Sequence, residues 1–233
     1  MAQIYDRYAE WKGWSGTPML EVVSERYAEE IRRTNIKPGS NILEIGFGNG
    51  AFLDWARGSY KVCGLEILQE LVDSAGTRGH LVFNGALENN VSRLPSPFDL
   101  VVMFDVMEHL RFDQIVQYLR LIKSILAPTG KLLMRVPNGL SFAGMVHQHG
   151  DITHLSVLTP DSVAQLAAIT GFEVAFVGNA ARSHRSGRSP KKALEKTVAY
   201  AMRGLVEVFF GYIYFGKRLP LDADLTFILT CRL

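Results

Sequence analysis

The amino-acid sequence predicts a doubly wound α/β fold, in which helices cover both faces of a mostly parallel sheet. The first observation is that short apolar runs alternate with amphipathic segments from residue 38 to residue 178, the pattern of successive β-α-β crossovers. The second is a glycine-rich turn, Gly46-Phe47-Gly48-Asn49-Gly50, which follows the first apolar run. The third is size, because 233 residues, 48% of them hydrophobic, suit one globular domain of this class with additions.

The apolar runs and amphipathic segments give the elements in order. Strands are expected at residues 41–45, 61–66, 80–84, 99–104 and 131–136, and helices near 51–57, 68–76 and 112–126. An earlier helix, from residue 19 to residue 34, ends before Pro38-Gly39, a pair that breaks helices.

The remaining elements follow the fifth strand. After residue 137 we expect a long loop that carries three histidines. A helix then begins at Thr159-Pro160-Asp161, which supplies an N-cap hydroxyl, a proline at the first position and an acid in the first turn. That helix ends at Gly171, and strands at 172–177 and 224–231 complete the sheet.

Charge, the N-terminus and cysteine content exclude several classes of protein. A net charge of +2 is too small to indicate a nucleic-acid partner. Residues 1–14 are charged and aromatic and lack the apolar core of a signal peptide, so a cytoplasmic location is expected. Cys63 and Cys231 both fall in apolar runs, and we expect buried free thiols rather than a disulfide.

The glycine-rich turn predicts a site for a nucleoside cofactor. Glycine is required where the backbone passes close to a ligand that a Cβ would meet. Glu44 adds an acceptor before the turn, and Glu66 ends the second strand, where a carboxylate accepts hydrogen bonds from ribose hydroxyls. These positions fit a dinucleotide as well as S-adenosylmethionine.

Two other nucleotide-binding classes find little support. A short-chain dehydrogenase needs Tyr-x-x-x-Lys well after its glycine turn, and the match at Tyr8 and Lys12 precedes the turn. The chain has no Gly-Lys-Ser/Thr segment of the kind that binds nucleoside triphosphates.

Three segments, in order along the chain, resemble class I S-adenosylmethionine-dependent methyltransferases. They are residues 44–50 (EIGFGNG), residues 98–110 (FDLVVMFDVMEHL) and residues 126–133 (LAPTGKLL). The Glu-His-Leu ending of the second segment is typical of the branch around ubiquinone-biosynthesis O-methyltransferases. The resemblance implies a Rossmann-like fold with seven strands, the last antiparallel, and S-adenosylmethionine as cofactor with S-adenosylhomocysteine as product.

The resemblance also implies a set of cofactor-binding residues. The turn residues would approach the methionine and ribose portions, and Glu44 would lie beside the amine and sugar. Glu66 would bind the ribose hydroxyls, with Ile67 against the adenine. The family has Gly-Asp after the third strand where this chain has Gly85-Ala86-Leu87-Glu88, so the adenine amine would be bound by the backbone of Ala86 or Leu87, or by Glu88. The full set is Glu44, Gly46, Phe47, Gly48, Gly50, Glu66, Ile67, Ala86, Leu87, Asp105 and Val106, the last two near the methyl donor.

Histidines are the candidates for acid–base chemistry, because their pKa is matched to neutral pH. His154 is the first candidate for a general base, since Asp-x-Thr-His followed by Leu-Thr-Pro resembles bacterial methyltransferases of polysaccharide biosynthesis. His109, after the fourth strand, is the second. A structural role is the alternative for both, and His80 is expected to be structural. His147, His149, His154 and Asp151 could ligate a metal, but their spacing matches no closed zinc motif and no metal is assigned.

Two flanking segments lack specific motifs. The aromatic residues Tyr5, Tyr8, Trp11 and Trp14 either cover the cofactor or acceptor or pack on the domain. In residues 182–217 a basic run, with His184 among the arginines and lysines, precedes an apolar stretch. Arg203 and Glu207 lie one helical turn apart in that stretch, could form a pair, and argue against a membrane-spanning helix. Peripheral membrane contact, packing on the domain and a homodimer contact stay open.

The sequence thus predicts four regions: an N-terminal cap (1–37), a cofactor-binding domain (38–181), a helical insertion (182–217) and a last strand (218–233). The predicted activity is O-methylation of a small-molecule or sugar-containing acceptor. The alternatives are N- or C-methylation, O-methylation of a quinone precursor, and a regulatory protein that binds the cofactor without turnover.

Overall fold

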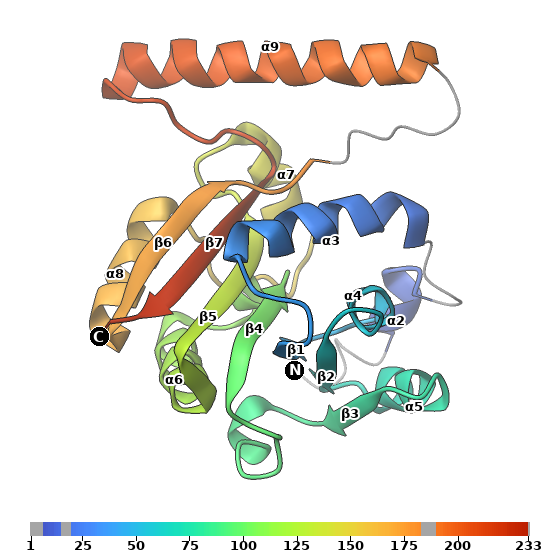
Figure 1. Cartoon of the computed structure of the whole chain (residues 1–233). Coiled ribbons are helices and arrows are strands. Elements are labelled where there is room, and N and C mark those ends of the chain that lie inside the picture. The colour runs from blue at the N-terminus through green and yellow to red at the C-terminus, as the bar shows by residue number, and fades with distance from the viewer. Residues whose placement is uncertain (1–6, 15–19, 183–189, 233) are drawn as a thin grey trace.

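The computed structural model describes residues 7–14, 20–182 and 190–232 (Figure 1). Its centre is a seven-stranded sheet with the order β3-β2-β1-β4-β5-β7-β6. The strands are β1 (Asn41–Ile45), β2 (Lys61–Glu66), β3 (Leu81–Asn84), β4 (Phe98–Phe104), β5 (Leu126–Pro137), β6 (Phe172–Asn179) and β7 (Asp224–Cys231). Strand β7 is antiparallel to both of its neighbours, while β1 to β5 pair in parallel. This topology confirms the predicted doubly wound, Rossmann-like fold.

The sheet is apolar on both faces, as buried parallel strands require. Strand β1 alternates its side chains between two clusters: Ile42 packs on one face of the sheet, and Leu43 and Ile45 pack on the other. Strand β4 lies beside β1 with Leu43 opposite Val101, and four of its central residues are completely buried. These strands form the core that fixes the ends from which the site is built.

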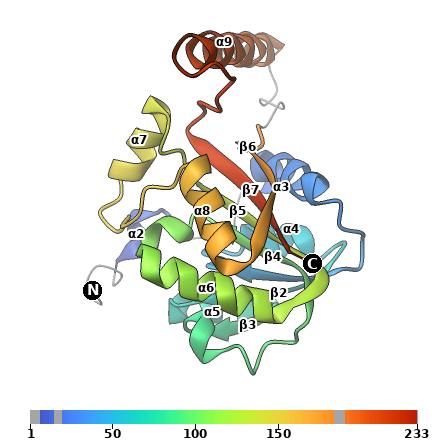
Figure 2. The same cartoon turned by 90° about the vertical axis from the view of Figure 1, so that its left-hand side faces the viewer.

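Helices cover the two faces separately (Figures 1 and 2). On one face lie α3 (Leu20–Thr34), α4 (Ala51–Ala56) and α5 (Gln69–Thr77). On the other lie α6 (Phe112–Ile125) and α8 (Pro160–Thr170). Helix α8 has the expected capping: Thr159 Oγ1 accepts from the backbone N–H of Ser162, and Gly171 ends the helix in the left-handed conformation.

Several elements differ from those expected. The segment after residue 137 is not a continuous loop, because it contains α7 (Phe142–His149), which Ser141 caps by accepting from the N–H of Gly144. Strand β5 begins five residues early, at Leu126. Cys63 is buried as expected, whereas Cys231 is only partly buried, because it lies at the end of β7.

The remaining elements are two short 3-10 turns inside the domain and two helices near the ends of the chain. The turns η1 (Leu87–Asn89) and η2 (Met107–His109) follow β3 and β4, and the short helix α2 (Tyr8–Trp11) precedes α3. Helix α9 (Pro190–Phe215) is the outermost element at the top of both views (Figures 1 and 2). By length and composition its segment Leu194–Phe215 could cross a membrane.

Candidate active site

A cleft opens at the carboxyl ends of β1, β2 and β4, the edge where open α/β sheets bind ligands. It has a volume of about 170 Å³. Seven of the eleven predicted cofactor-binding residues line it: Gly46, Glu66, Ile67, Ala86, Leu87, Asp105 and Val106. His109 lines it as well, together with Tyr8 and Trp14 from the N-terminal segment. The sequence therefore predicted most of its wall.

The glycine turn after β1 has the backbone conformation that glycine alone adopts without strain. Gly46, Gly48 and Gly50 have φ values of +71°, +56° and +78°. A Cβ on Gly46 would come within 2.5 Å of Val106 Cγ2. A Cβ on Gly48 would come within 2.9 Å of the ring of Trp14, so this tryptophan packs directly on the turn.

Replacing Gly46 with alanine should destabilise the protein by about 3 kcal/mol. The left-handed conformation costs a non-glycine residue about 1–2 kcal/mol, and the contact with Val106 adds an overpacking cost of about 1–3 kcal/mol. Urea denaturation measures the change. Gly76→Ala is the matched control, because Gly76 lies inside α5 with open space around it and alanine there should be neutral or stabilising. Equal effects of the two substitutions would contradict the assignment.

Glu66 closes the cleft at the end of β2. Its side chain is buried and accepts hydrogen bonds from the backbone N–H groups of Gly48 (3.0 Å), Ile67 (2.7 Å) and Leu68 (3.1 Å). Burial raises the pKa of Glu66, and these three hydrogen bonds oppose the rise. The carboxylate thus joins the glycine turn to the start of α5 and faces the cleft.

Glu44 lies on β1 and, unlike the following Ile45 and Gly46, does not itself line the cleft. It is 3% exposed, and within the described part of the chain its Oε2 has no hydrogen-bond partner. Burial, and then the nearby charge of Glu66, raise the pKa of Glu44 well above its ordinary value. A buried acceptor without a partner beside a cleft fits the amine or hydroxyl donors of a nucleoside cofactor.

Phe47 and Gly50, two residues of the glycine turn, do not line the cleft. The ring of Phe47 packs beneath the turn in a cluster with Leu53 and Leu71, and it occupies the space over Gly64. Gly50 begins α4, and its open side faces the guanidinium of Arg78. Any contact of these two residues with a cofactor would be made by their backbone.

A second cavity of about 430 Å³ adjoins the cleft. Asp105 lines both, at a φ of +57°, and Arg135 holds its carboxylate through Nε at 3.0 Å and through Nη2. His154 lines the second cavity and not the cleft. The wall is rich in charge, with Lys12, Arg26, Glu108, Arg135, Asp151 and Asp224.

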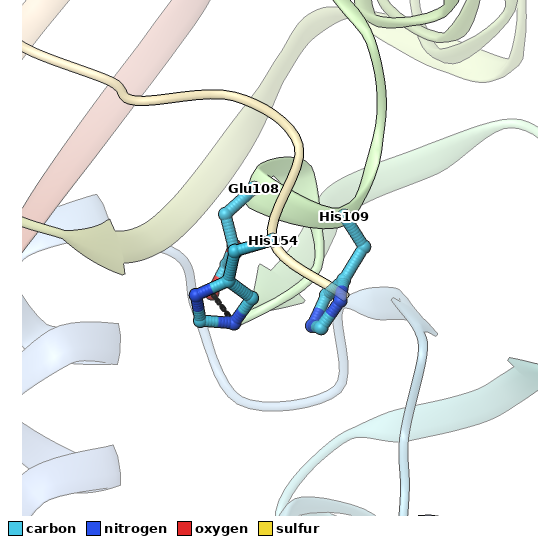
Figure 3. Close-up of side chains that lie close together, drawn as sticks. All are labelled: Glu108, His109 and His154. Carbon is cyan, nitrogen blue, oxygen red and sulfur yellow. Dashed lines mark ion pairs between the residues drawn. The ribbon is translucent and has the colours of Figure 1, made fainter. Parts of the chain in front are cut away.

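The two candidate histidines lie close together (Figure 3), with His109 on the wall of the cleft and His154 on the wall of the second cavity. The rings of His109 and His154 pack edge to face with centroids 4.7 Å apart. His154 Nδ1 lies 3.1 Å from the carbonyl oxygen of Gln148, which cannot donate, so Nδ1 carries the proton and Nε2 is left as the acceptor. Nε2 lies 3.7 Å from a carboxylate oxygen of Asp151 and 3.9 Å from one of Glu108.

Asp151 connects the histidines to the N-terminal segment. It accepts from Tyr8 Oη at 3.1 Å and from Thr153 Oγ1 at 2.5 Å, and it forms an ion pair with Lys12 at 3.0 Å. Thr153 Oγ1 also lies 2.8 Å from His109 Nδ1. Burial acts to raise the pKa of Asp151, but the contacts with Thr153 and Lys12 outweigh it. The pKa of Asp151 is therefore below its ordinary value, and the group is ionised. Helix α2 is thereby fastened over both cavities.

Burial keeps both histidines neutral at neutral pH. It lowers the pKa of His109 to about 4, with a further contribution from His154, and it lowers the pKa of His154 despite the opposing charge of Asp151. Burial also raises the pKa of Glu108 well above its ordinary value, and within the described residues neither of its carboxylate oxygens has a hydrogen-bond partner. A neutral histidine with a free Nε2 can accept a proton.

Glu108, His109 and His154 could also hold a metal ion, because one ligand atom from each lies within 4.8 Å of the others (Figure 3). This group differs from the four residues that the sequence suggested. His147 instead lies 2.8 Å from Asp224, and His149 is exposed at the end of α7. His80 lies 2.7 Å from Asp54 of α4 and lines neither cavity, in keeping with the structural role expected of it.

The free energy of unfolding should fall as the pH is lowered from about 6.5 to 4. The unfolded chain binds a proton at His109 near pH 6.5, whereas the folded protein binds it only near pH 4. The full difference is about 3 kcal/mol. Urea denaturation of the wild type and His109→Gln between pH 7 and pH 4 measures it, and the variant should lose less stability on acidification.

The comparison between variant and wild type is needed because Glu44 and Glu66, whose pKa values are raised, stabilise the folded state on acidification. His149→Gln, on an exposed residue, should leave the pH dependence unchanged. If His109→Gln and wild type lose stability in parallel, His109 is not buried in its neutral form.

Several wall residues escaped the sequence analysis. Glu108 could have been predicted, because it stands next to His109 at the end of β4. Nothing in the sequence indicates that Arg135, Tyr118 and Lys12 line the two cavities. Among the aromatic residues, Tyr8 and Trp14 line the cleft and Trp11 lines the second cavity, whereas Tyr5 lies outside the described residues.

Comparison with solved structures supports the fold. A methyltransferase from Archaeoglobus fulgidus that depends on S-adenosylmethionine is 18% identical, with a TM-score of 0.68 over 97% of this chain and 99% of that chain. The methyltransferase of Haloferax volcanii in complex with the Trm112 activator is 14% identical, with a TM-score of 0.65 over 100% and 97%. The cyclopropane synthase MmaA2 from Mycobacterium tuberculosis is 18% identical, with a TM-score of 0.61 over 93% and 86%. A search of curated proteins gave no match.

Family membership comes from the sequence itself. The family described as "Methyltransferase domain" matches residues 19–176, about two thirds of the chain, and this span contains the glycine turn, Glu66 and both histidines. The chain belongs to the methyltransferase domain family and is an S-adenosylmethionine-dependent methyltransferase.

Proposed function

We propose that this enzyme transfers the methyl group to a hydroxyl of a small-molecule or sugar-containing acceptor bound in the second cavity. The observation that carries the proposal is that His154 lines this cavity with an unprotonated Nε2, while Asp105 joins the cavity to the cofactor cleft. A neutral imidazole is suited to take the proton of a hydroxyl near neutral pH.

The cofactor supplies an electrophilic methyl group on a sulfonium. The residues of the chain position the two reactants and accept the proton, and such positioning can account for roughly 7–11 kcal/mol of the barrier. The acceptor oxygen bonds to the methyl carbon as the carbon–sulfur bond breaks and its electron pair stays on sulfur. His154 Nε2 takes the hydroxyl proton, and the ionised Asp151 at 3.7 Å stabilises the resulting imidazolium.

The charged wall of the second cavity favours a polar acceptor. Lys12, Arg26 and Arg135 offer donors, and Asp105 and Asp224 offer acceptors, which suits the many hydroxyls of a sugar better than an apolar ring. Helix α2 and its neighbours then act as the cap proposed for residues 1–37, with Tyr8 and Trp14 over the cofactor cleft. The predicted boundaries at residues 38, 182 and 218 and the cytoplasmic location stay predictions.

A screen with methyl-labelled S-adenosylmethionine over sugars, nucleotide sugars, phenols and amines tests the proposal. Label transfer to a sugar or phenolic hydroxyl is the expected result, and the position of the label identifies the accepting atom. Transfer to nitrogen or carbon would favour an N- or C-methyltransferase. Transfer to a phenolic quinone precursor and to no sugar would favour the quinone-precursor O-methyltransferase. Tight cofactor binding without transfer to any acceptor would favour a regulatory protein.

A further inference from the structure

Helix α9 presents its apolar side to solvent, the reverse of an ordinary surface helix. The less exposed residues, which share one side of the helix and turn toward the domain, are Lys196, Tyr200, Gly204, Glu207, Phe210 and Gly211. The opposite side is apolar and 41–72% exposed over twenty residues: Leu194, Val198, Met202, Leu205, Val206, Val208, Phe209, Tyr212 and Ile213.

The polar side holds α9 to the domain. Glu207 is 1% exposed and accepts from Arg218 at 2.7 Å, from Asn179, and from Arg182 at 3.4 Å. These partners replace the Arg203–Glu207 pair expected from the sequence. At Gly211 a Cβ would meet the backbone of residues 217–219, so the chain that leaves the helix packs tightly against it. The orientation of the helix is therefore fixed by the domain and leaves the apolar side outward.

The apolar side is bordered by positive charge. Residues 190–218 contain six basic and two acidic residues, although the whole chain has a net charge of only +2. Of the two acidic residues, Glu207 is buried and pairs with Arg218, and Glu195 is exposed, as are Lys191, Arg203 and Lys217. Basic residues around an apolar helix face with aromatic side chains match the anionic headgroups and acyl boundary of a bilayer.

The helix cannot cross the bilayer in this arrangement. Arg182, before α9, bonds to Asp222, after it, through Nε at 2.5 Å, so both flanks belong to the same domain. A spanning helix would put its two flanks on opposite sides of the membrane and would place Glu207 in hydrocarbon. The outward apolar side, roughly 30 Å long, instead suits a helix that lies in the plane of the interface.

We propose that α9 docks this methyltransferase on a membrane surface rich in anionic lipids, with the apolar side inserted among the lipid headgroups and acyl chains. Flotation with vesicles of phosphatidylcholine alone and of phosphatidylcholine with phosphatidylglycerol tests it. The wild type should bind the anionic vesicles at least tenfold more tightly than the neutral ones, and 0.5 M salt should weaken this preference. The double variant Leu205→Glu, Phe209→Glu should lose binding at least tenfold.

Ile169→Glu is the matched control, because Ile169 is an equally exposed apolar residue on α8 and should leave vesicle binding unchanged. Cofactor affinity, measured on the same proteins, should be unchanged in both variants, which shows that they fold and separates this inference from the proposed reaction. A wild type that floats with neither vesicle would overturn the proposal. So would a stable dimer that the double variant dissociates, since a second copy of the chain would then cover the apolar side.

Discussion

Replacing Glu66 with alanine should raise the dissociation constant for S-adenosylmethionine by about 100-fold or more. Two hydrogen bonds from ribose hydroxyls to a carboxylate contribute roughly 1.5–3 kcal/mol each, and 1.4 kcal/mol is a factor of ten. The variant also removes the acceptor for the N–H groups of Gly48, Ile67 and Leu68, which should loosen the glycine turn. Calorimetric titration with S-adenosylmethionine and S-adenosylhomocysteine measures the change.

Two further variants make the Glu66 result specific. Glu70→Ala removes an exposed carboxylate from the first turn of α5 and should leave the dissociation constant unchanged. Glu66→Gln keeps the length of the side chain and one acceptor oxygen, so its effect should be intermediate. An unchanged dissociation constant in Glu66→Ala would remove this residue from the cofactor site.

The His154→Ala variant should lose about 10²- to 10⁴-fold in kcat, the usual contribution of a general base, while the affinity for the cofactor stays the same. We expect kcat to fall without a change in cofactor affinity because His154 lines the second cavity and not the cleft. Single-turnover measurements with labelled cofactor, on an acceptor found in the screen, give the rate. Full turnover in this variant would exclude His154 as the base.

His149→Ala is the control for the histidine prediction, since His149 is exposed and should be silent. A chelator distinguishes the base from a metal ligand, because Glu108, His109 and His154 could together hold a cation. Activity that a chelator abolishes and a divalent cation restores would assign His154 Nε2 to the metal rather than to the proton. Activity that is insensitive to chelation supports the base.

The parts of the site that depend on local sequence were predictable. The glycine turn and Glu66 each follow a buried strand, and a parallel sheet brings the ends of such strands to one edge. Phe47 shows the limit of this reasoning, because the pattern places it in the turn but only the packing of α4 and α5 turns its ring into the core. The resemblance of the chain to known methyltransferases identified the cofactor, which the turn alone left open.

The contacts that shape the second cavity join residues far apart in the chain. Tyr8 and Asp151 are 143 positions apart, and no periodicity or motif links them. The helix α7 was expected as loop because its eight residues are too short for a clear hydrophobic period, and its cap, Ser141, is a common residue. Arg135 lies inside a strand, where an isolated charge gives no sign that it will hold Asp105.

One short peptide connects α9 to the second cavity. Asp222 bonds to Arg182 beside the helix, and two residues later Asp224 begins β7 and lines the second cavity. Asn138 and Ser141, at the start of the segment that carries α7, both donate to the carbonyl oxygen of Asp222. Asp222 thus links α9 to the wall of the second cavity through a few bonds, whereas the glycine turn follows β1, which β4 and β5 separate from β7 in the sheet.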